Sequence, residues 1–285
     1  MNYVEETRRL IARYDIHARK RFGQNFLIDN HVLDKIIAAA DVCRDDFILE
    51  IGPGVGTMTR ALCEHAGRVL AVEIDYDLVD ILERELVPIY DNLEIREGDI
   101  LKMDIGEIAE NNNAGKPIKV VANLPYYITT PIIMELLENH APIQSITVMV
   151  QREVAERMMA EPGSRDCGAV SLAVSYYATA SLEANVPANC FIPRPHVDSA
   201  VIRLNIRENP PVLTDDENLM FKLIRAGFGE RRKTLANAIT NSPELNFSKE
   251  EVNQTISLAG IDPGIRGEKL GLDDYARLAD FFSKK

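Results

Sequence analysis

Short apolar runs rich in Val, Ile and Leu recur through the first 150 residues of the 285-residue chain. Segments with apolar residues at helical spacing alternate with these runs, and strands that alternate with helices form parallel βαβ units. The pattern therefore predicts an α/β fold with a doubly wound, Rossmann-like sheet and helices on both faces. The expected strands span residues 47–51, 69–73, 93–96, 119–122 and 146–150, and the expected helices span 31–40, 58–65, 78–86 and 131–139.

The pattern changes after residue 150. Residues 182–186 and 199–206 have the composition of strands, and their short connection predicts an antiparallel hairpin at the sheet edge. Asn209-Pro210-Pro211 indicates a linker. Beyond it the sequence predicts helices but no strand, so we expect a large domain over 1–208 and a small all-helical domain over 209–285. The expected helices there span 215–227, 230–240, 248–259 and 273–282.

A glycine-rich loop follows the first strand, in ILEIGPGVGTMT at residues 48–59. Gly52, Gly54 and Gly56 allow a tight turn and a close approach of a ligand to the backbone. The NAD fingerprint requires glycine at position 57, which is Thr57 here. Glu50 before Gly52-Pro53-Gly54 instead matches the acidic-x-Gly-x-Gly form of S-adenosylmethionine enzymes. The loop alone still leaves a dinucleotide site or a simple βα turn open.

Two acidic residues follow the next strands. Glu73 ends the run RVLAVE and lies about 20 residues beyond the loop, where a carboxylate can accept hydrogen bonds from both ribose hydroxyls of an adenosine. NAD sites use the same contact, so Glu73 indicates an adenosine without identifying the cofactor. Asp99 follows the third strand, where it could accept from the exocyclic amine of an adenine or serve only as a turn residue.

The motif Asn123-Leu124-Pro125-Tyr126 comes directly after the strand KVVA, at the sheet edge where open α/β folds bind ligands. The exocyclic amine of a base is a poor nucleophile, because its lone pair is delocalised into the ring. An Asn side-chain oxygen and a main-chain carbonyl can accept from this NH₂ and direct the lone pair toward an electrophilic methyl group. Pro125 fixes the local geometry, and Tyr126 can stack on an extruded base. The motif therefore indicates methylation of a base amine.

The formal net charge of −12 argues against a nucleic-acid partner, but the distribution of charge changes this picture. Residues 1–25 carry six Lys and Arg against three Asp and Glu, a net charge of +3. Residues 221–235 carry five against one, a net charge of +4, and include Arg231, Arg232 and Lys233. These two basic segments suit local RNA contacts and are equally compatible with solvated helix faces.

The remaining composition excludes several classes of protein. The four Cys and five His have no metal-site spacing, so we expect no metal. No segment approaches the roughly 18 apolar residues of a membrane helix. The N-terminal segment also lacks the apolar block and cleavage site of a secretion signal. We therefore expect a cytoplasmic protein without a membrane partner, and a monomer by default.

Eight segments together resemble the small-subunit (16S) ribosomal RNA adenine dimethyltransferases, in that family's order and over nearly the whole chain. They are GQNFLID (23–29), EIGPGVGTMT (50–59), AVEID (71–75), EGDIL (97–101), NLPYYITTPI (123–132), MVQREVAERM (149–158), FIPRPHVDSAVIRL (191–204) and GFGERRKTLANAI (227–239). The resemblance implies N6,N6-dimethylation of two adjacent adenosines in a hairpin near the 3′ end of small-subunit rRNA. It also implies S-adenosylmethionine as cofactor, the partly assembled small subunit as partner, and a role in its biogenesis.

The resemblance also implies a role for each matching residue. The cofactor contacts would be Asn25, Leu27, Gly52, Gly54, Glu73, Asp99 and Asn123. The adenine would lie at Asn123, Leu124, Pro125 and Tyr126, with Phe191 on its other face, although Phe191 could instead be a core aromatic. The helical domain would contribute to rRNA binding through Arg231, Arg232 and Lys233.

Two alternatives remain at this point. A large-subunit rRNA adenine N6-methyltransferase shares the Asn-x-Pro-Tyr chemistry, although the long C-terminal region and residues 191–204 favour the small-subunit family. A non-catalytic rRNA-binding assembly factor could retain the fold, although the intact set of Glu73, Asp99 and Asn123 argues against it.

Overall fold

A computed structural model describes residues 2–19, 22–230 and 232–284. The chain divides into two compact units, one formed by residues 1–155 and 180–206 and the other by residues 156–179 and 207–285. The C-terminal unit therefore includes residues 156–179, which the sequence-based boundary assigns to the larger domain.

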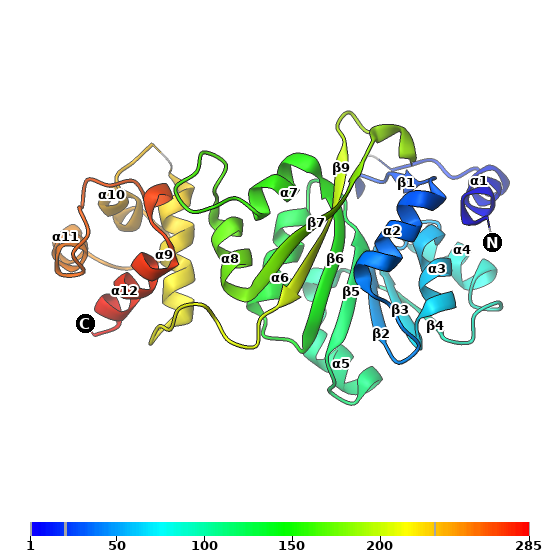
Figure 1. Cartoon of the computed structure of the whole chain (residues 1–285), viewed down its shortest axis with the longest axis horizontal. Coiled ribbons are helices and arrows are strands. Elements are labelled where there is room, and N and C mark those ends of the chain that lie inside the picture. Colours follow the sequence, from blue (N-terminus) through cyan, green and yellow to red (C-terminus); the bar gives the residue numbers. More distant parts are fainter. Residues whose placement is uncertain (1, 20–21, 231, 285) are drawn as a thin grey trace. The chain divides into compact units, whose positions relative to one another are not determined.

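The first unit is built on a seven-stranded sheet with the order β4-β3-β2-β5-β6-β9-β7 (Figure 1). Its first five strands are parallel, and β9 runs antiparallel to β6. The chain builds β2, β3 and β4 outward in one direction and then crosses back to place β5 on the other side of β2. This reversal creates a topological switch point between β2 and β5, and the predicted doubly wound α/β class is confirmed. The strands are β2 (Phe47–Ile51), β3 (Arg68–Glu73), β4 (Leu93–Glu97), β5 (Ile118–Asn123), β6 (Ile143–Gln151), β7 (Ala178–Val186) and β9 (Ser199–Ile206).

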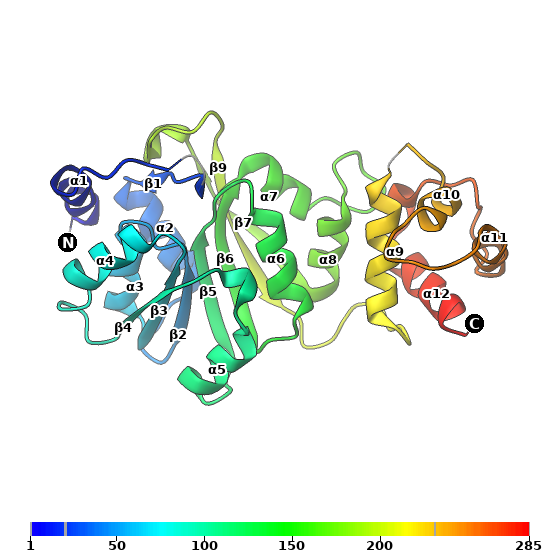
Figure 2. The same cartoon turned by 180° about the vertical axis from the view of Figure 1, so that it is seen from behind.

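Helices cover both faces of this sheet, as Figures 1 and 2 show for α2 and α3 on one face and α6 on the other. Asp29 caps α2 by accepting from the backbone N–H of Val32, and Asp75 begins α4 in the same manner through Asp77. The helices of this unit are α1 (Tyr3–Arg13), α2 (Asn30–Ala40), α3 (Thr57–His65), α4 (Tyr76–Glu85), α5 (Ile105–Asn113) and α6 (Thr129–Glu138), and α7 (Arg152–Met158) begins in it.

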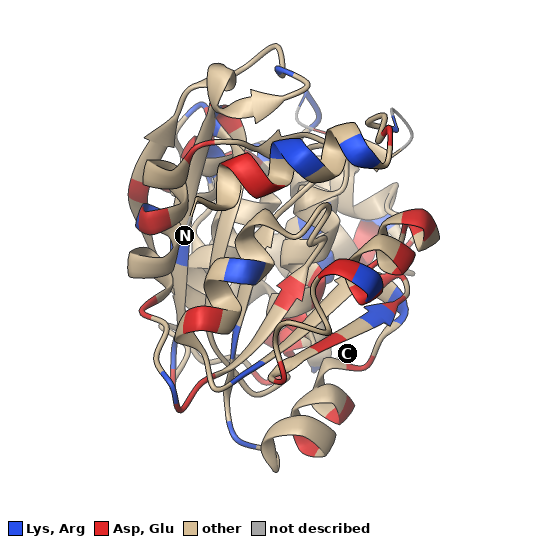
Figure 3. Ribbon diagram, turned by 90° about the vertical axis from the view of Figure 1, so that its right-hand side faces the viewer, with Lys and Arg blue, Asp and Glu red and all other residues tan. Residues whose placement is uncertain are grey.

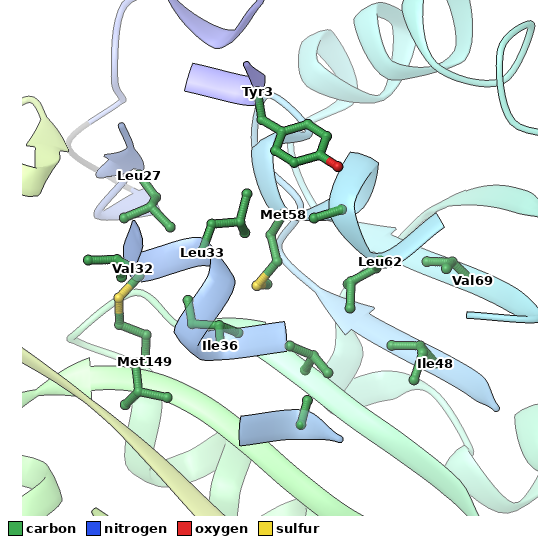
Figure 4. Close-up of a cluster of buried hydrophobic side chains, with 14 of the residues drawn as sticks. Tyr3, Leu27, Val32, Leu33, Ile36, Ile48, Met58, Leu62, Val69 and Met149 are labelled. Atoms are coloured by element: carbon green, nitrogen blue, oxygen red, sulfur yellow. The ribbon is translucent and has the colours of Figure 1, made fainter. Parts of the chain in front are cut away.

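The core on one face of the sheet joins α2 and α3 to the central strands. Leu33 and Ile36 of α2 meet Met58 and Leu62 of α3 over Ile48 of β2 (Figure 4). All five side chains are at most 5% exposed, so this contact removes a large apolar area from water. The core thereby fixes the start of α3 directly behind the glycine-rich loop.

Two short strands that the sequence did not predict attach the N-terminal segment to the sheet domain. In β1 (Phe26–Leu27) and β8 (Phe191–Ile192), Phe26 pairs with Ile192 and Leu27 with Phe191 in antiparallel register. The predicted late strands are present as β7 and β9, which are neighbours at the sheet edge.

The second unit is helical in the residues described, as predicted for the C-terminal region. Tyr177 of α8 stacks on Phe221 of α9 with a centroid distance of 5.1 Å, and the hydroxyl of Tyr177 donates to Glu217 of the same helix. Gly227 of α9 lies against Gly267, where a Cβ on Gly267 would come within 2.6 Å of the Gly227 backbone, and a Cβ on Gly227 would collide with the hydroxyl of Tyr275. The helices are α8 (Ala169–Tyr177), α9 (Glu217–Gly229), α10 (Leu235–Thr240), α11 (Lys249–Leu258) and α12 (Leu272–Ser283).

Two structural features bear on the expected partners. Among the described residues, no helix combines the length and apolar character needed to cross a bilayer. Within the same residues, no group of three or more His, Cys, Asp or Glu is arranged to hold a metal ion.

Lys and Arg are interspersed with Asp and Glu over the elements that face the viewer in Figure 3.

Candidate active site

The register of the parallel strands brings the predicted site residues to one level of the sheet. Ile51 of β2 pairs with Val72 of β3 and with Ala122 of β5. The next residue on each strand, Gly52, Glu73 and Asn123, therefore lies at the same carboxyl edge. This edge is the switch point between β2 and β5, where open α/β sheets bind their ligands.

The glycine-rich loop needs glycine for two different reasons. Gly52 has a φ of +69°, a conformation that side chains disfavour, and, its chain neighbours apart, no atom of the described residues lies within 4 Å of the position that its Cβ would occupy. Gly56 has a φ of +80°, and a Cβ there would lie 2.6 Å from Leu86. The first glycine leaves open space for a ligand, whereas the second allows the loop to pack on α4 and its following turn.

Glu73 is buried at the floor of the pocket and organises the backbone around it. Its Oε2 accepts from the N–H of Gly54 at 3.0 Å, and its Oε1 accepts from the N–H groups of Ile74 and Asp75 at 2.9 and 3.0 Å. Burial raises the pKa of Glu73 against the opposing effect of these donors. A carboxylate offers about four lone-pair positions, so the three bonds leave capacity for a ligand hydroxyl.

Asn123 is oriented by the N-terminal segment. Its Nδ2 donates to the backbone carbonyl of Asn25 at 3.1 Å, which fixes the amide plane. Leu124 donates its N–H to Met149 on the neighbouring strand, and Pro125 accepts from the N–H of Ile128 and the hydroxyl of Thr129. The turn that carries Asn123 is therefore held rigidly at both of its ends.

Tyr126 is half-buried beside this turn. Its hydroxyl lies 2.8 Å from the hydroxyl oxygen of Ser199, the first residue of β9. Burial raises the pKa of the Tyr126 phenol, so the group stays protonated near neutral pH. An aromatic ring held by both ends suits a fixed stacking surface.

Asp99 lies in the turn after β4, the strand that pairs with the Glu73-bearing strand β3. Its Oδ1 accepts from the N–H of Leu101 at 3.2 Å, and its Oδ2 lies 3.7 Å from the ammonium of Lys102. Each oxygen retains acceptor capacity, and Gly98, Asp99, Ile100 and Leu101 all line the pocket.

The N-terminal segment forms another wall of the pocket. Gln24 donates through Nε2 to Asp75 at 3.0 Å, and the guanidinium of Arg19 pairs with Asp75 and Asp77. Phe26 and Leu27 follow in β1. The segment is thus attached to the turn that follows Glu73, and Gln24 and Glu73 line the same pocket.

These elements enclose one hollow with about 1110 Å³ of empty space, including solvent at its mouth. Apolar side chains line most of it, and the polar groups converge from three strand ends, as in ligand sites generally. S-adenosylmethionine, an adenosine joined to an amino acid, fits this set of groups. Glu73 and Asp99 offer hydrogen-bond acceptors for the adenosine, and Gly52 leaves open space beside them. The predicted site residues among the lining are Asn25, Leu27, Gly52, Gly54, Glu73, Asp99, Asn123, Leu124, Pro125 and Tyr126.

The structure does not bring every predicted site residue to this pocket. Phe191 is 3% exposed and packs in the core beside Leu27. Arg232 and Lys233 are exposed in the C-terminal unit, and Arg231 lies outside the described residues.

Two residues with no role assigned from the sequence also line the pocket. Glu50 belongs to the glycine-loop motif, yet it is fully buried and both of its carboxylate oxygens lack a hydrogen-bond partner among the described residues. Burial raises its pKa to about 8 against the opposing effect of the nearby Thr59 hydroxyl, whose geometry falls short of a hydrogen bond. Tyr127 follows Tyr126 and is 60% exposed. An acidic residue inside an apolar strand and a doubled tyrosine were the available signals for these two positions.

The fold resembles that of a dimethyladenosine transferase from Plasmodium falciparum, with a TM-score of 0.72 at 26% identity over 91% of this chain and 98% of that one. The fold and the site define an S-adenosylmethionine-dependent methyltransferase. The model of the family described as ribosomal RNA adenine dimethylase matches residues 16–284. The chain belongs to this family and is an rRNA adenine dimethyltransferase.

Two further comparisons are with proteins whose names contain a type of rRNA or a ribosomal subunit. The chain is 57% identical over 281 residues to ribosomal RNA small subunit methyltransferase A of Lachnoclostridium phytofermentans, covering 99% of this chain and 97% of that protein. The 23S rRNA methyltransferase ErmE has a similar fold, with a TM-score of 0.62 at 24% identity over 91% of this chain and all of that one.

Proposed function

We propose that the chain dimethylates N6 of two adjacent adenosines in a hairpin near the 3′ end of small-subunit rRNA. It acts as a cytoplasmic monomer on the partly assembled small subunit, needs no metal, and contributes to subunit biogenesis. The observation that carries this proposal is the position of Asn123, whose amide is fixed at the same level of the sheet as Gly52 and Glu73.

Asn123 supports transfer to an amine in particular. Its Nδ2 is engaged by Asn25, and its Oδ1 is the atom of the amide that can accept from an incoming amine. The N6 amine of adenine can donate both of its hydrogens, one to Oδ1 of Asn123 and one to a main-chain carbonyl of this turn. Because these bonds fix the hydrogens, the lone pair of N6 rotates out of conjugation with the ring. The amine releases its proton during or after transfer, so the site requires no strong base.

The other residues bind and orient the reactants. Glu73 accepts from the ribose and Asp99 accepts from the adenine of the cofactor, with Asn25, Leu27, Gly52 and Gly54 along its length. When bound, the cofactor supplies a methyl group on a sulfonium, which is already an activated leaving group. Catalysis then depends on positioning and electrostatics, and Tyr126 holds the extruded adenine by stacking.

The small subunit is favoured over the large subunit by the comparisons. The relative that shares 57% of its residues over nearly the full length is named for the small subunit. The likeness to the large-subunit enzyme, at 24% identity, concerns the fold alone.

Three roles rest on the resemblance of motifs. We assign catalysis to residues 1–208 and rRNA contacts to residues 209–285, through Arg231, Arg232 and Lys233. We also keep Phe191 as the second aromatic of the adenine site. Because Phe191 is buried beside Leu27, this role requires the bound RNA or cofactor to open the packing around it.

The test is methyl transfer from labelled S-adenosylmethionine to two substrates, undermethylated small subunits and large-subunit rRNA. After digestion to nucleosides, we expect label in N6,N6-dimethyladenosine from the small subunit alone. Label confined to large-subunit RNA would support the rival specificity, and no label in either substrate would indicate a non-catalytic assembly factor.

A further inference from the structure

The two tyrosines of the Asn-Leu-Pro-Tyr-Tyr turn have different surroundings. Tyr126 is half-buried and held by Ser199 through its hydroxyl. Tyr127 is 60% exposed, although it lines the same pocket. Tyr126 therefore belongs to the interior of the site, whereas Tyr127 presents most of its ring at the mouth.

The Tyr127 ring has a fixed neighbour on one side. A Cβ at Gly23 would lie 3.1 Å from Cδ1 and 3.3 Å from Cε1 of Tyr127, closer than ordinary contact. Gly23 also has a φ of +58°, which favours glycine. The absence of a side chain at Gly23 thus lets the ring rest against the N-terminal segment.

The substrate supplies a reason for an exposed aromatic at this place. An enzyme that modifies a base extrudes it from the stack, and the neighbouring base then loses a stacking partner. Aromatic side chains replace such partners, at roughly 1–3 kcal/mol per base and with little dependence on sequence. Tyr127 directly follows the tyrosine assigned to the extruded adenine and exposes most of its ring at the same pocket, so a base beside the target could reach it.

We propose that Tyr127 stacks on the nucleobase adjacent to the target adenine and so holds the RNA strand at the mouth of the pocket. This inference rests on the proposed function. Phe191 cannot take this position without leaving the core, in which it is 3% exposed.

The first test compares Tyr127→Ala with Tyr127→Phe, using methyl transfer to undermethylated small subunits. For the Ala variant, we expect KM for subunits to rise about 5- to 150-fold, the equivalent of the stacking energy. We expect kcat and the affinity for S-adenosylmethionine to stay within about twofold. The Phe variant keeps the π face and should match the wild type.

Tyr76→Ala is the matched control, because Tyr76 is 62% exposed on the same unit and does not line the pocket. We expect it to leave KM unchanged.

A second test reports stacking directly. The chain contains no tryptophan, so Tyr127→Trp introduces a single indole. We expect undermethylated subunits to quench its emission, with wild-type enzyme plus subunits as the blank and Tyr76→Trp as the unquenched control. Cofactor alone should cause no quenching.

Two results would overturn the inference: an unchanged KM for Tyr127→Ala or an unquenched indole on bound subunits. An unchanged KM with weakened cofactor binding would assign the ring to the cofactor, and an unquenched indole would assign it to solvent. Both results presuppose a wild-type enzyme that methylates small subunits. Failure of that activity would instead refute the proposed function.

Discussion

Two glutamates lie on neighbouring strands at the base of the pocket, and their surroundings differ. Glu73 receives three backbone N–H donors, whereas Glu50 is buried with both oxygens unpartnered among the described residues. An unpaired buried carboxylate is costly when ionised, and burial raises the pKa of Glu50 to about 8. Burial therefore favours the protonated form of Glu50 in the folded chain.

Because burial raises the pKa of Glu50, we expect the free energy of unfolding to depend on pH. Unfolded glutamate has a pKa of about 4.3, so between that pH and about 8 the native state holds a proton that the unfolded chain has released. The contribution of Glu50 is complete below pH 4.3 and is lost as pH rises, by about 1.4 kcal/mol per unit. Glu50→Gln should thus gain stability relative to the wild type from pH 5 to pH 8, as measured by urea unfolding.

The control for this measurement is Glu83→Gln, because Glu83 is exposed on α4. Parallel curves of unfolding free energy against pH for the wild type and Glu50→Gln would contradict the assignment of the proton to Glu50.

At the scale of elements, Glu73 links two loops that the cofactor must contact together. Its carboxylate bonds the N–H of Gly54 in the glycine-rich loop and those of Ile74 and Asp75 in the turn after β3. Asp75 of this turn also accepts a hydrogen bond from Gln24 of the N-terminal segment. Glu73 therefore contacts two walls of the pocket directly, and one of these walls holds the third.

Glu73→Ala should raise the dissociation constant for S-adenosylmethionine about 10- to 150-fold, measured by calorimetry. The expectation follows from about 1.5–3 kcal/mol for a lost charge-assisted hydrogen bond. Glu97→Ala is the control, because Glu97 pairs with Glu73 in the strand register but is exposed. Equal affinities of Glu73→Ala and wild type would remove Glu73 from the cofactor site.

The elements also differ in how well the sequence predicts them. The strands of the central sheet are rich in Val, Ile and Leu and were predicted to within a few residues. The two-residue strands β1 and β8 show no periodicity, so the pairing that brings the N-terminal segment beside Phe191 could not be predicted. Helix α8 is apolar on nearly all sides, so it lacks the pattern of an amphipathic helix. Helix α5 buries only Ile105, Ile108 and Ala109 before it ends in three asparagines, so its apolar stripe is too short to predict a helix.

The site residues were predicted for a different reason. Glycine, acidic and Asn-Pro motifs at strand ends reflect chemistry that few other residues provide. The burial of individual site residues could not be predicted from those motifs, because it depends on packing between segments that are distant in the sequence. Phe191 and Glu50 show this limit, since the first lies in the core and the second is an acidic residue with no exposed surface.

At the scale of the whole molecule, a net charge of −12 must be reconciled with an RNA substrate. The N-terminal basic segment is largely paired within its own unit: Arg9 with Glu6, Arg13 with Glu85, and Arg19 with Asp75 and Asp77. Lys20 and Arg21 lie outside the described residues. The +3 charge of this segment therefore overstates what it offers to phosphates.

Arg232 and Lys233 are exposed and can reach RNA phosphates. We expect neutralisation of these two residues together with Arg231 to weaken small-subunit binding. The slope of log K against log salt concentration should fall by roughly one unit per lost phosphate contact. Cofactor affinity should not change. Replacing the exposed Arg44, Lys116 and Lys249 is the control with an equal change of charge. If the first variant binds subunits like wild type across a salt series, its three residues are only a solvated face.

The measurement that tests the account most directly is single-turnover methyl transfer to undermethylated small subunits by Asn123→Ala, saturated with cofactor. Because Asn123 acts on the amine chiefly in the transition state, we expect the rate to fall roughly 100- to 1000-fold. Subunit binding, measured in parallel, should change only a few-fold. A folded, cofactor-saturated Asn123→Ala enzyme that transfers methyl groups at nearly the wild-type rate would contradict the account.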